Sequence, residues 1–264
     1  MEHIRQPAVA GMFYPAKREQ LHQDVSHYLQ EAPSPPANEP VPKAIIVPHA
    51  GYVYSGPVAA TAYARLRPAR ETIHRVVLLG PSHRIPLFGL ATSSATAFTT
   101  PLGSIPVDGA ALEAIADLPQ VRRMDEAHVQ EHSLEVHLPF LQEVLDNFTL
   151  VPLVVGDASP EQVAEVLERL WGGPETLIVI SSDLSHYFDY ETARRLDRTT
   201  SRAIENLNLE EVHSENACGC RPVAGLLYLA RQKGMTAETI DLRNSGDTAG
   251  ARDQVVGYGA YVLR

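Results

Sequence analysis

Short, continuous runs of apolar residues recur along the chain, separated by longer amphipathic stretches. Four of these runs are rich in β-branched residues, and they span residues 44–48, 76–80, 150–156 and 177–181. Strands have this composition when helices cover both faces of a parallel sheet. Helical patterns lie before, between and after these runs, at 18–29, 57–66, 108–116, 138–146, 160–170, 190–207 and 221–232. The alternation predicts a three-layer α/β/α sandwich with a mostly parallel central sheet, as a single domain over residues 1–264.

Prolines and shorter runs refine this outline. Pro57 follows Gly56 and Pro160 follows Ser159, which suits the place of proline in a first helical turn. Residues 31–42 hold five prolines and predict an extended surface connector. Residues 87–107 predict short strands joined by turns, a ribbon at the edge of the sheet, and further strands are expected at 239–244 and 255–263.

The charge and cysteine content exclude several classes of protein. The formal net charge is −10 and no basic cluster occurs, so we expect no nucleic-acid partner and no binding to an anionic membrane. No apolar run approaches the ~20 residues of a membrane helix, and the first residues lack the layout of a signal peptide. We therefore expect a cytoplasmic protein. Its two cysteines, Cys218 and Cys220, exclude a disulfide scaffold and leave both thiols available for chemistry.

The eleven histidines are the unusual part of the composition, and three of them follow predicted strands. His49 follows the first strand, His83 the second, and His186 follows the strand that ends at residue 181, with Asp183 between them. In an open α/β sheet, ligands bind beyond the carboxyl ends of the strands. Neutral imidazole is the commonest protein ligand for transition metals. A pair of histidines at neighbouring strand ends therefore predicts a metal site.

The residues themselves leave the third ligand open between Asp183 and Cys218. Cys218 lies just before a helix that is expected to start near Pro222, and Arg221 adds positive charge. A thiolate at a helix N-terminus is stabilised by the helix dipole, so this thiol is expected to lose its proton readily and to be a good ligand. The alternative is that Cys218 and Cys220 are two idle or buried thiols.

The segment 131–137 contains two histidines but does not have the spacing of a zinc protease helix. That motif needs histidines four residues apart, whereas His132 and His137 are five apart. Either one can still enter the site as an outer partner of a ligand or as a group that faces the substrate. Leu134, Leu138, Leu141 and Leu145 recur at helical spacing and are expected in the core.

At these motifs the chain resembles the Memo family, also called AmmeMemoRadiSam system protein B. The resemblance covers nearly the whole length and rests on AGMFYP, VPHAGYVYSG, LLGPSH, EHSLEVHLPF, SSDLSHY, CGCRPV and GYGAYV, in this order. The family is similar in fold to the class III extradiol dioxygenases, which are non-haem iron enzymes. The resemblance therefore implies the same sandwich and a metal-binding function.

The resemblance also implies particular site residues. It places the metal at His49, His83 and Cys218, with Asp183 and His186 beside it. In the dioxygenases a glutamate is the third ligand, so a cysteine in that place departs from their pattern. Fe(II) is the expected cofactor, and the soft thiolate also suits copper or zinc. Phe13, Tyr14, Tyr52 and Tyr54 can line the pocket, although aromatic packing is the safer explanation for each.

The expected function is that of an iron-binding protein with a dioxygenase-like or oxidoreductase-like site and a small-molecule substrate. His186 would act as the acid and base, and Asp183 would orient a ligand imidazole or His186 itself. The alternative is a non-catalytic module that binds metal or peptide and acts with an AMMECR1-like protein and a radical SAM enzyme, partners that the family name suggests. Zinc-assisted hydrolysis on the same three ligands is a third option that no residue specifically supports.

Overall fold

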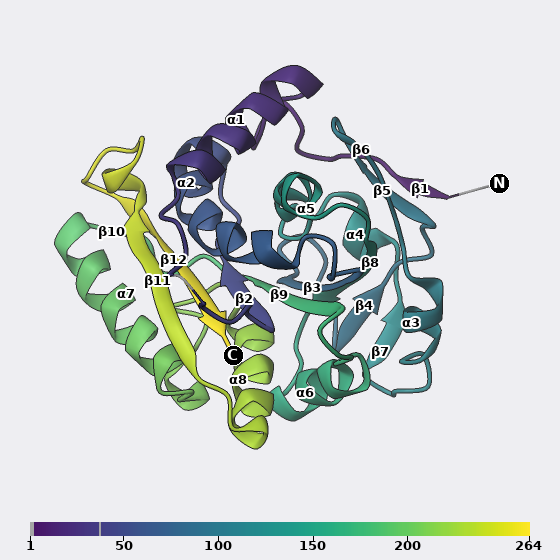
Figure 1. Cartoon of the computed structure of the whole chain (residues 1–264). Helices are drawn as coiled ribbons and strands as arrows, with labels where there is room; N and C mark the ends of the chain where they lie inside the picture. The colour runs from purple at the N-terminus through teal and green to yellow at the C-terminus, as the bar shows by residue number, and fades with distance from the viewer. Residues whose placement is uncertain (1–2, 37) are drawn as a thin grey trace.

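A nine-stranded mixed sheet organises the residues described in the computed structural model, 3–36 and 38–264 (Figure 1). Its strand order is β10-β12-β2-β9-β3-β8-β4-β7, with β11 also pairing with β12. The strands are β2 (Ala44–Val47), β3 (Arg75–Pro81), β4 (Leu90–Thr92), β7 (Val121–Arg123), β8 (Thr149–Val155), β9 (Thr176–Ser181), β10 (His186–Phe188), β11 (Ala237–Asn244) and β12 (Val255–Leu263). The four central strands, β2, β9, β3 and β8, are parallel. They are the four runs predicted from the sequence.

Helices cover both faces of this sheet, as the two-sided burial of its strands requires. In β2, Ile45 and Val47 face one core, while Ala44 and Ile46 face the other. The first core is closed by α1 (Arg18–Glu31), α2 (Tyr52–Tyr63) and α5 (Leu138–Val144). The second is closed by α3 (Gly109–Glu113), α6 (Pro160–Arg169), α7 (Tyr190–Glu205) and α8 (Cys220–Lys233). The predicted three-layer sandwich is thus confirmed, and the four leucines of residues 134–145 are buried in the first core.

The predicted ribbon at residues 87–107 is divided between two sheets. β4 joins the large sheet beside β8, whereas β5 (Ala97–Thr100) and β6 (Gly103–Pro106) form a hairpin in a separate three-stranded sheet. The third strand there is β1 (Ile4–Arg5), which pairs with β5 in parallel. The sequence pattern predicts the hairpin, but its partner strand comes from the N-terminal end of the chain, more than 90 residues earlier.

The helix expected from Pro57 begins five residues earlier, so the prediction for that proline is wrong. Pro57 lies inside α2, because buried Tyr52 starts the helix and its N–H bonds to the Phe13 carbonyl. Pro160 does occupy the first turn of α6, after the N-cap Ser159. Ser159 and Gln162 form a complete capping box there, which satisfies two backbone N–H groups at the helix start.

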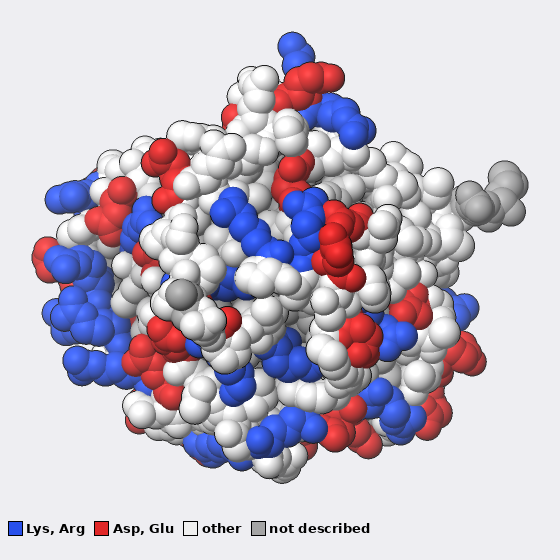
Figure 2. All heavy atoms as spheres, viewed as in Figure 1, with Lys and Arg blue, Asp and Glu red and all other residues white. Residues whose placement is uncertain are grey.

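The surface carries charges of both signs. On the face shown in Figure 2, Lys and Arg are interspersed with Asp and Glu, and neither sign forms one large field. Among the helices of the described residues, none is long and apolar enough to cross a membrane.

Candidate metal centre

Three neighbouring strands bring the predicted site residues to one edge of the sheet. The order β2-β9-β3 puts the ends of these strands side by side, and they are followed by His49, Asp183 and His83 respectively. A cavity of about 1090 Å³ opens there. Its lining includes Phe13, His49, Tyr54, His83, His132, Asp183, His186 and Cys218. The strand order brings His49, Asp183 and His83 together, and other segments complete a lining that joins residues as far as 205 positions apart, from Phe13 to Cys218.

Three imidazoles form the compact group in this cavity. One ring nitrogen from each of His49, His83 and His132 lies within 4.8 Å of the other two, so these residues can hold a metal ion. Burial lowers the pKa of His49, and burial together with the charge of His83 lowers the pKa of His132 to about 4. Both rings are therefore neutral near pH 7, which is the protonation state that binds a metal ion.

Glu131 connects two of these histidines and is itself buried. Its Oε1 lies 2.9 Å from His83 Nδ1 and accepts the N–H groups of His132 and Ser133, and its Oε2 accepts the N–H of His83 at 2.7 Å. Burial would raise the pKa of Glu131, but these hydrogen bonds and the His83 ring outweigh it and lower the pKa to about 2. The carboxylate accepts Nδ1–H of His83 and leaves Nε2 free to face a metal.

His49 lies at the centre of the site and is held from two sides. Its backbone N–H donates to Asp183 Oδ1 at 2.7 Å, and its Nδ1 lies 2.6 Å from the Ser181 hydroxyl. On the cavity side, its Nε2 is 3.3 Å from Cys218 Sγ and 4.0 Å from Asp183 Oδ2. Asp183 thus holds the His49 backbone; that it orients a ligand imidazole stays a prediction. Burial raises the pKa of Asp183 to about 6.

Cys218 lies beside His49 but outside the group of three imidazoles. Its assignment as a ligand stays a prediction. The expectation that its thiol is acidic is wrong for the metal-free protein, because burial first and then the Asp183 carboxylate raise its pKa well above the usual range. Helix α8 starts only at Cys220, two residues later, so the helix dipole acts from a distance.

Gly219 lets Cys218 approach the end of β9. A Cβ at this position would lie 2.3 Å from the Ser181 carbonyl oxygen and 2.7 Å from Ser182 Cβ. We therefore expect Gly219→Ala to lower the free energy of unfolding by about 1–3 kcal/mol, the cost of overpacking a filled site, and to move Cys218 away from His49. Urea unfolding measures this, with Gly109→Ala as the control because a Cβ there meets nothing within 4 Å. Equal stabilities for the two variants would contradict this account of Gly219.

His186 comes from the loop that follows β9 and starts β10. Its Nδ1 lies 2.8 Å from the Leu184 carbonyl, which can only accept, so Nδ1 carries the proton and Nε2 is an acceptor. The loop is fixed by Asp197 of α7, whose Oδ1 accepts the Ser185 N–H at 3.0 Å. The partner that orients His186 is therefore a backbone carbonyl, and Asp183 does not take that part.

The other residues suggested for the pocket separate into two groups. Phe13 and Tyr54 line the cavity, and the Phe13 ring lies 4.7 Å from the His132 ring. Tyr14 and Tyr52 are buried and donate to Glu135 and to the Val136 carbonyl, so packing explains them. His137 is also buried and does not line the cavity, but it reaches the site through Ser181, at 2.8 Å from its hydroxyl.

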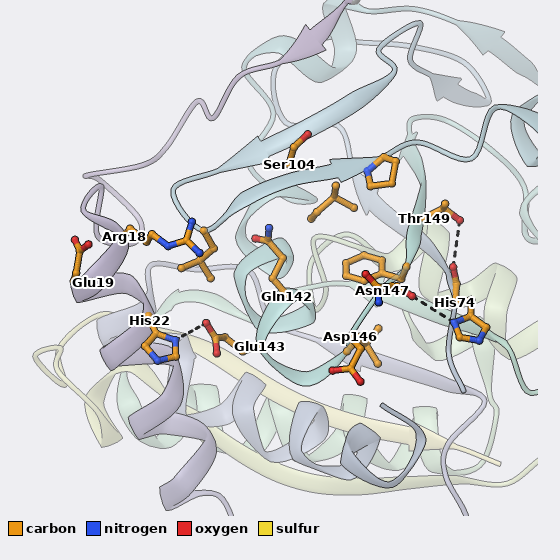
Figure 3. Close-up of a pocket in the computed structure, with 15 residues that line it drawn as sticks. Arg18, Glu19, His22, His74, Ser104, Gln142, Glu143, Asp146, Asn147 and Thr149 are labelled. Atoms are coloured by element: carbon orange, nitrogen blue, oxygen red, sulfur yellow. Dashed lines mark hydrogen bonds and ion pairs between the residues drawn. The ribbon is translucent and has the colours of Figure 1, made fainter. Parts of the chain in front are cut away.

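A second hollow of about 730 Å³ lies between α1, α5 and β6 (Figure 3). Its two histidines, His22 and His74, lie on opposite sides of it, and His22 is 2.7 Å from the Glu143 carboxylate. Within the part of the chain that the structure describes, the group able to hold a metal is in the other cavity. The strand-end cavity is therefore the candidate site.

Two site residues were missed in the sequence, Glu131 and Ser181. Glu131 precedes His132 directly, in a segment without the spacing of a zinc protease helix, and no sequence pattern marks its carboxylate as a site residue. Ser181 is the last residue of β9, just before the candidate residues Asp183 and His186. A polar residue at the end of an otherwise apolar buried strand is the signal that could have identified Ser181.

Comparison with known proteins agrees with the motifs. The model of a family described as "Memo-like protein" matches residues 5–262. A "MEMO1 family protein" of Aquifex aeolicus is 39% identical over 97% of this chain and 97% of its own length. Another, of Archaeoglobus fulgidus, is 37% identical over 99% of this chain and 100% of its own. Among solved structures, an uncharacterized protein from Escherichia coli K12 matches with a TM-score of 0.49 at 10% identity, over 83% of this chain and 98% of that one. The match of the family model over almost the whole length, with relatives at these identities, shows that this chain belongs to the Memo family.

Proposed function

We propose that this chain is a non-haem iron oxidoreductase of the dioxygenase type, with its metal at the ends of β2 and β3. The observation that supports this most is the group of three imidazoles, His49, His83 and His132, whose ring nitrogens lie within 4.8 Å of one another. Two of these rings, His49 and His83, have Nδ1 occupied by a buried partner, so Nε2 is left for the metal.

The proposed donor set also includes Cys218. Metal–nitrogen and metal–sulfur bonds are about 2.0 and about 2.3 Å long in zinc sites, so two donors to one ion must lie close together. Cys218 Sγ is 3.3 Å from His49 Nε2, so both atoms would be able to hold the same ion. The raised pKa of the thiol means that binding the metal must displace its proton, so affinity should increase with pH. Nitrogen and sulfur donors suit Fe(II), and also copper or zinc.

The protein side of the chemistry is proton transfer at His186. A bound Fe(II) would supply a redox-active Lewis acid. His186 lines the same cavity and presents Nε2 as an acceptor, so it can take a proton from a substrate hydroxyl and return it later. Asp183 holds the His49 backbone and adds negative charge beside the metal position. The substrate is a small molecule that fits the cavity of about 1090 Å³.

Two substitutions separate metal binding from turnover. We expect Cys218→Ser to lower the affinity for Fe(II) or Co(II) by at least about 100-fold, beyond what loss of an outer partner costs, and to remove the sulfur-to-cobalt absorption. His186→Ala should retain the wild-type metal content and abolish turnover, because its Nε2 is proposed to transfer protons and not to bind the ion. Elemental analysis and absorption spectra measure both. Wild-type metal content in Cys218→Ser would exclude the thiol as a ligand.

Activity itself is tested by loading the protein with Fe(II) under anaerobic conditions and then adding O₂ with catechols. Consumption of O₂ in proportion to substrate supports the oxidoreductase. Bleaching of the site or oxidation of the thiol without loss of substrate contradicts it.

Exposed apolar residues around the cavity favour a second candidate, a non-catalytic module that binds a partner protein. Tyr54, Tyr187 and Phe188 line the cavity, and Tyr187 is 71% exposed. Met12, next to Phe13, is 72% exposed. Exposed apolar patches of this kind are typical of interaction sites. The proposed partners are an AMMECR1-like protein and a radical SAM enzyme. Binding of either one that is lost in Tyr187→Ser, with no O₂ consumption by wild type, would favour this function.

A further inference from the structure

The Ser181 hydroxyl lies between two buried imidazoles and a carbonyl. Ser181 Oγ is 2.6 Å from His49 Nδ1, 2.8 Å from His137 Nε2 and 2.6 Å from the Ser133 carbonyl oxygen. All four residues are at most 2% exposed. Water does not reach these polar atoms, so they must form their hydrogen bonds with one another.

The donors and acceptors around Ser181 Oγ determine which atoms carry the protons. A hydroxyl has one proton to donate and two lone pairs that accept, while a carbonyl oxygen only accepts. Ser181 therefore gives its proton to Ser133 and must accept from both rings. His49 then carries its proton on Nδ1, and His137 carries its proton on Nε2.

We infer that Ser181 is a positioning residue that fixes His49 in the Nδ1–H tautomer, so that the lone pair of Nε2 faces the cavity. This inference rests on the proposed role of His49 as a metal ligand. His137, which does not line the cavity, fills the second lone pair of Ser181. With both lone pairs occupied and its proton on Ser133, the hydroxyl cannot turn to donate to His49. Neutral rings are required, and burial lowers the pKa of both, for His137 to about 3.

His83, the neighbouring proposed ligand, is held by its Nδ1 in the same way. His83 Nδ1 lies 2.9 Å from Glu131 Oε1, a carboxylate that only accepts at neutral pH. Both histidines thus present Nε2 toward one point, one through a serine and one through a glutamate. A metal that binds at this point meets two rings whose tautomers are already set, so no proton has to move on either ring.

The test is the tautomer of His49 in the full-length, metal-free protein. Long-range ¹H–¹⁵N spectra of protein labelled with ¹⁵N-histidine show which ring nitrogen carries the proton. In wild type we expect protonated Nδ1 in His49 and protonated Nε2 in His137. In Ser181→Ala the His49 signal should show the Nε2–H form, and the affinity for Co(II) should fall by about 10- to 100-fold, as for other outer partners of metal ligands.

Ser133→Ala is the matched control. Ser133 is equally buried, but its hydroxyl donates only to the Pro81 carbonyl, at 2.8 Å. Its removal should cost stability while the His49 tautomer and the affinity for Co(II) stay at wild-type values. A wild-type spectrum with protonated Nε2 in His49 would overturn the inference, even if Ser181→Ala fails to fold. So would an unchanged tautomer in a folded Ser181→Ala. If wild type shows the expected tautomers but binds no Co(II), Fe(II) or Zn(II), the proposed function fails and the assignment of the protons stands.

Discussion

Glu131→Gln is expected to lower the metal affinity of this site by about 10- to 100-fold, the usual cost of losing the outer partner of a ligating histidine. Glutamine has the same shape but only one oxygen, while both oxygens of Glu131 are used. Oε1 serves the His83 ring and two backbone N–H groups, and Oε2 accepts the N–H of His83. The amide NH₂ would face at least one buried donor, so the His83 tautomer and the position of His132 would both be disturbed. Calorimetric titration with Co(II) measures the loss.

The same substitution has a defined dependence on pH. Because the pKa of Glu131 is lowered to about 2 in the folded protein, its carboxylate stabilises the fold fully above the pKa of the unfolded chain, about 4.5. That contribution, about 3 kcal/mol at neutral pH, is lost as the pH falls through this interval toward 2. Urea unfolding at pH 7 and pH 3 should therefore show a larger difference between wild type and Glu131→Gln at pH 7.

A control of equal charge change is Glu126→Gln, since Glu126 is exposed on α4 (Glu126–Val129). We expect it to change neither the affinity for Co(II) nor the stability by more than about 0.5 kcal/mol. If Glu131→Gln binds Co(II) as wild type does, the carboxylate does not orient His83, and the account of the site's outer contacts is wrong.

The parts of the site that could be predicted are those that follow strands. A buried parallel strand can be recognised in the sequence as a continuous apolar run, and the first polar residues after the run mark its end. This pattern predicts His49, His83 and Asp183 as site residues. The parallel order β2-β9-β3 then places the three of them side by side. The local pattern was sufficient because the geometry of a parallel sheet brings all strand ends of one direction to one edge.

His132 and Glu131 could not be placed by the same reasoning. They lie in an irregular segment between α4 and the 3₁₀ turn Glu135–His137, where no periodicity indicates a direction. Their position depends on tertiary packing against the end of β3. Gly80 shows how close this is, because a Cβ there would lie 2.7 Å from Ser133 Oγ and 2.9 Å from Leu134 Cδ2. The acidity of Cys218 does not follow from the sequence for a related reason, since the burial that raises the pKa of its thiol is a tertiary property.

The N-terminal segment was likewise not predicted to support the site, although it does so through a buried ion pair. Arg5 of β1 pairs with Glu135, and it also donates to the His128 and Glu131 carbonyls, the latter at 2.7 Å. Glu135 in turn accepts the N–H groups of Ala8 and Val9 and the Tyr14 hydroxyl at 2.6 Å. The pair thus joins the first residues of the chain to the segment that carries Glu131 and His132.

Arg5→Met should therefore give the largest loss of stability, about 3–5 kcal/mol, because it leaves a buried carboxylate without its cation and two carbonyls without their donor. Both side chains are at most 4% exposed, so water cannot replace the guanidinium. Chemical unfolding followed by circular dichroism measures this loss. Arg221→Met is the control, since Arg221 and its partner Asp157 are more than half exposed and such pairs contribute at most about 1 kcal/mol. The affinity for Co(II) should also fall in Arg5→Met, because the Glu131 carbonyl that Arg5 holds belongs to the residue that orients His83. A loss no larger than that of Arg221→Met would mean that the N-terminal segment does not stabilise the metal site.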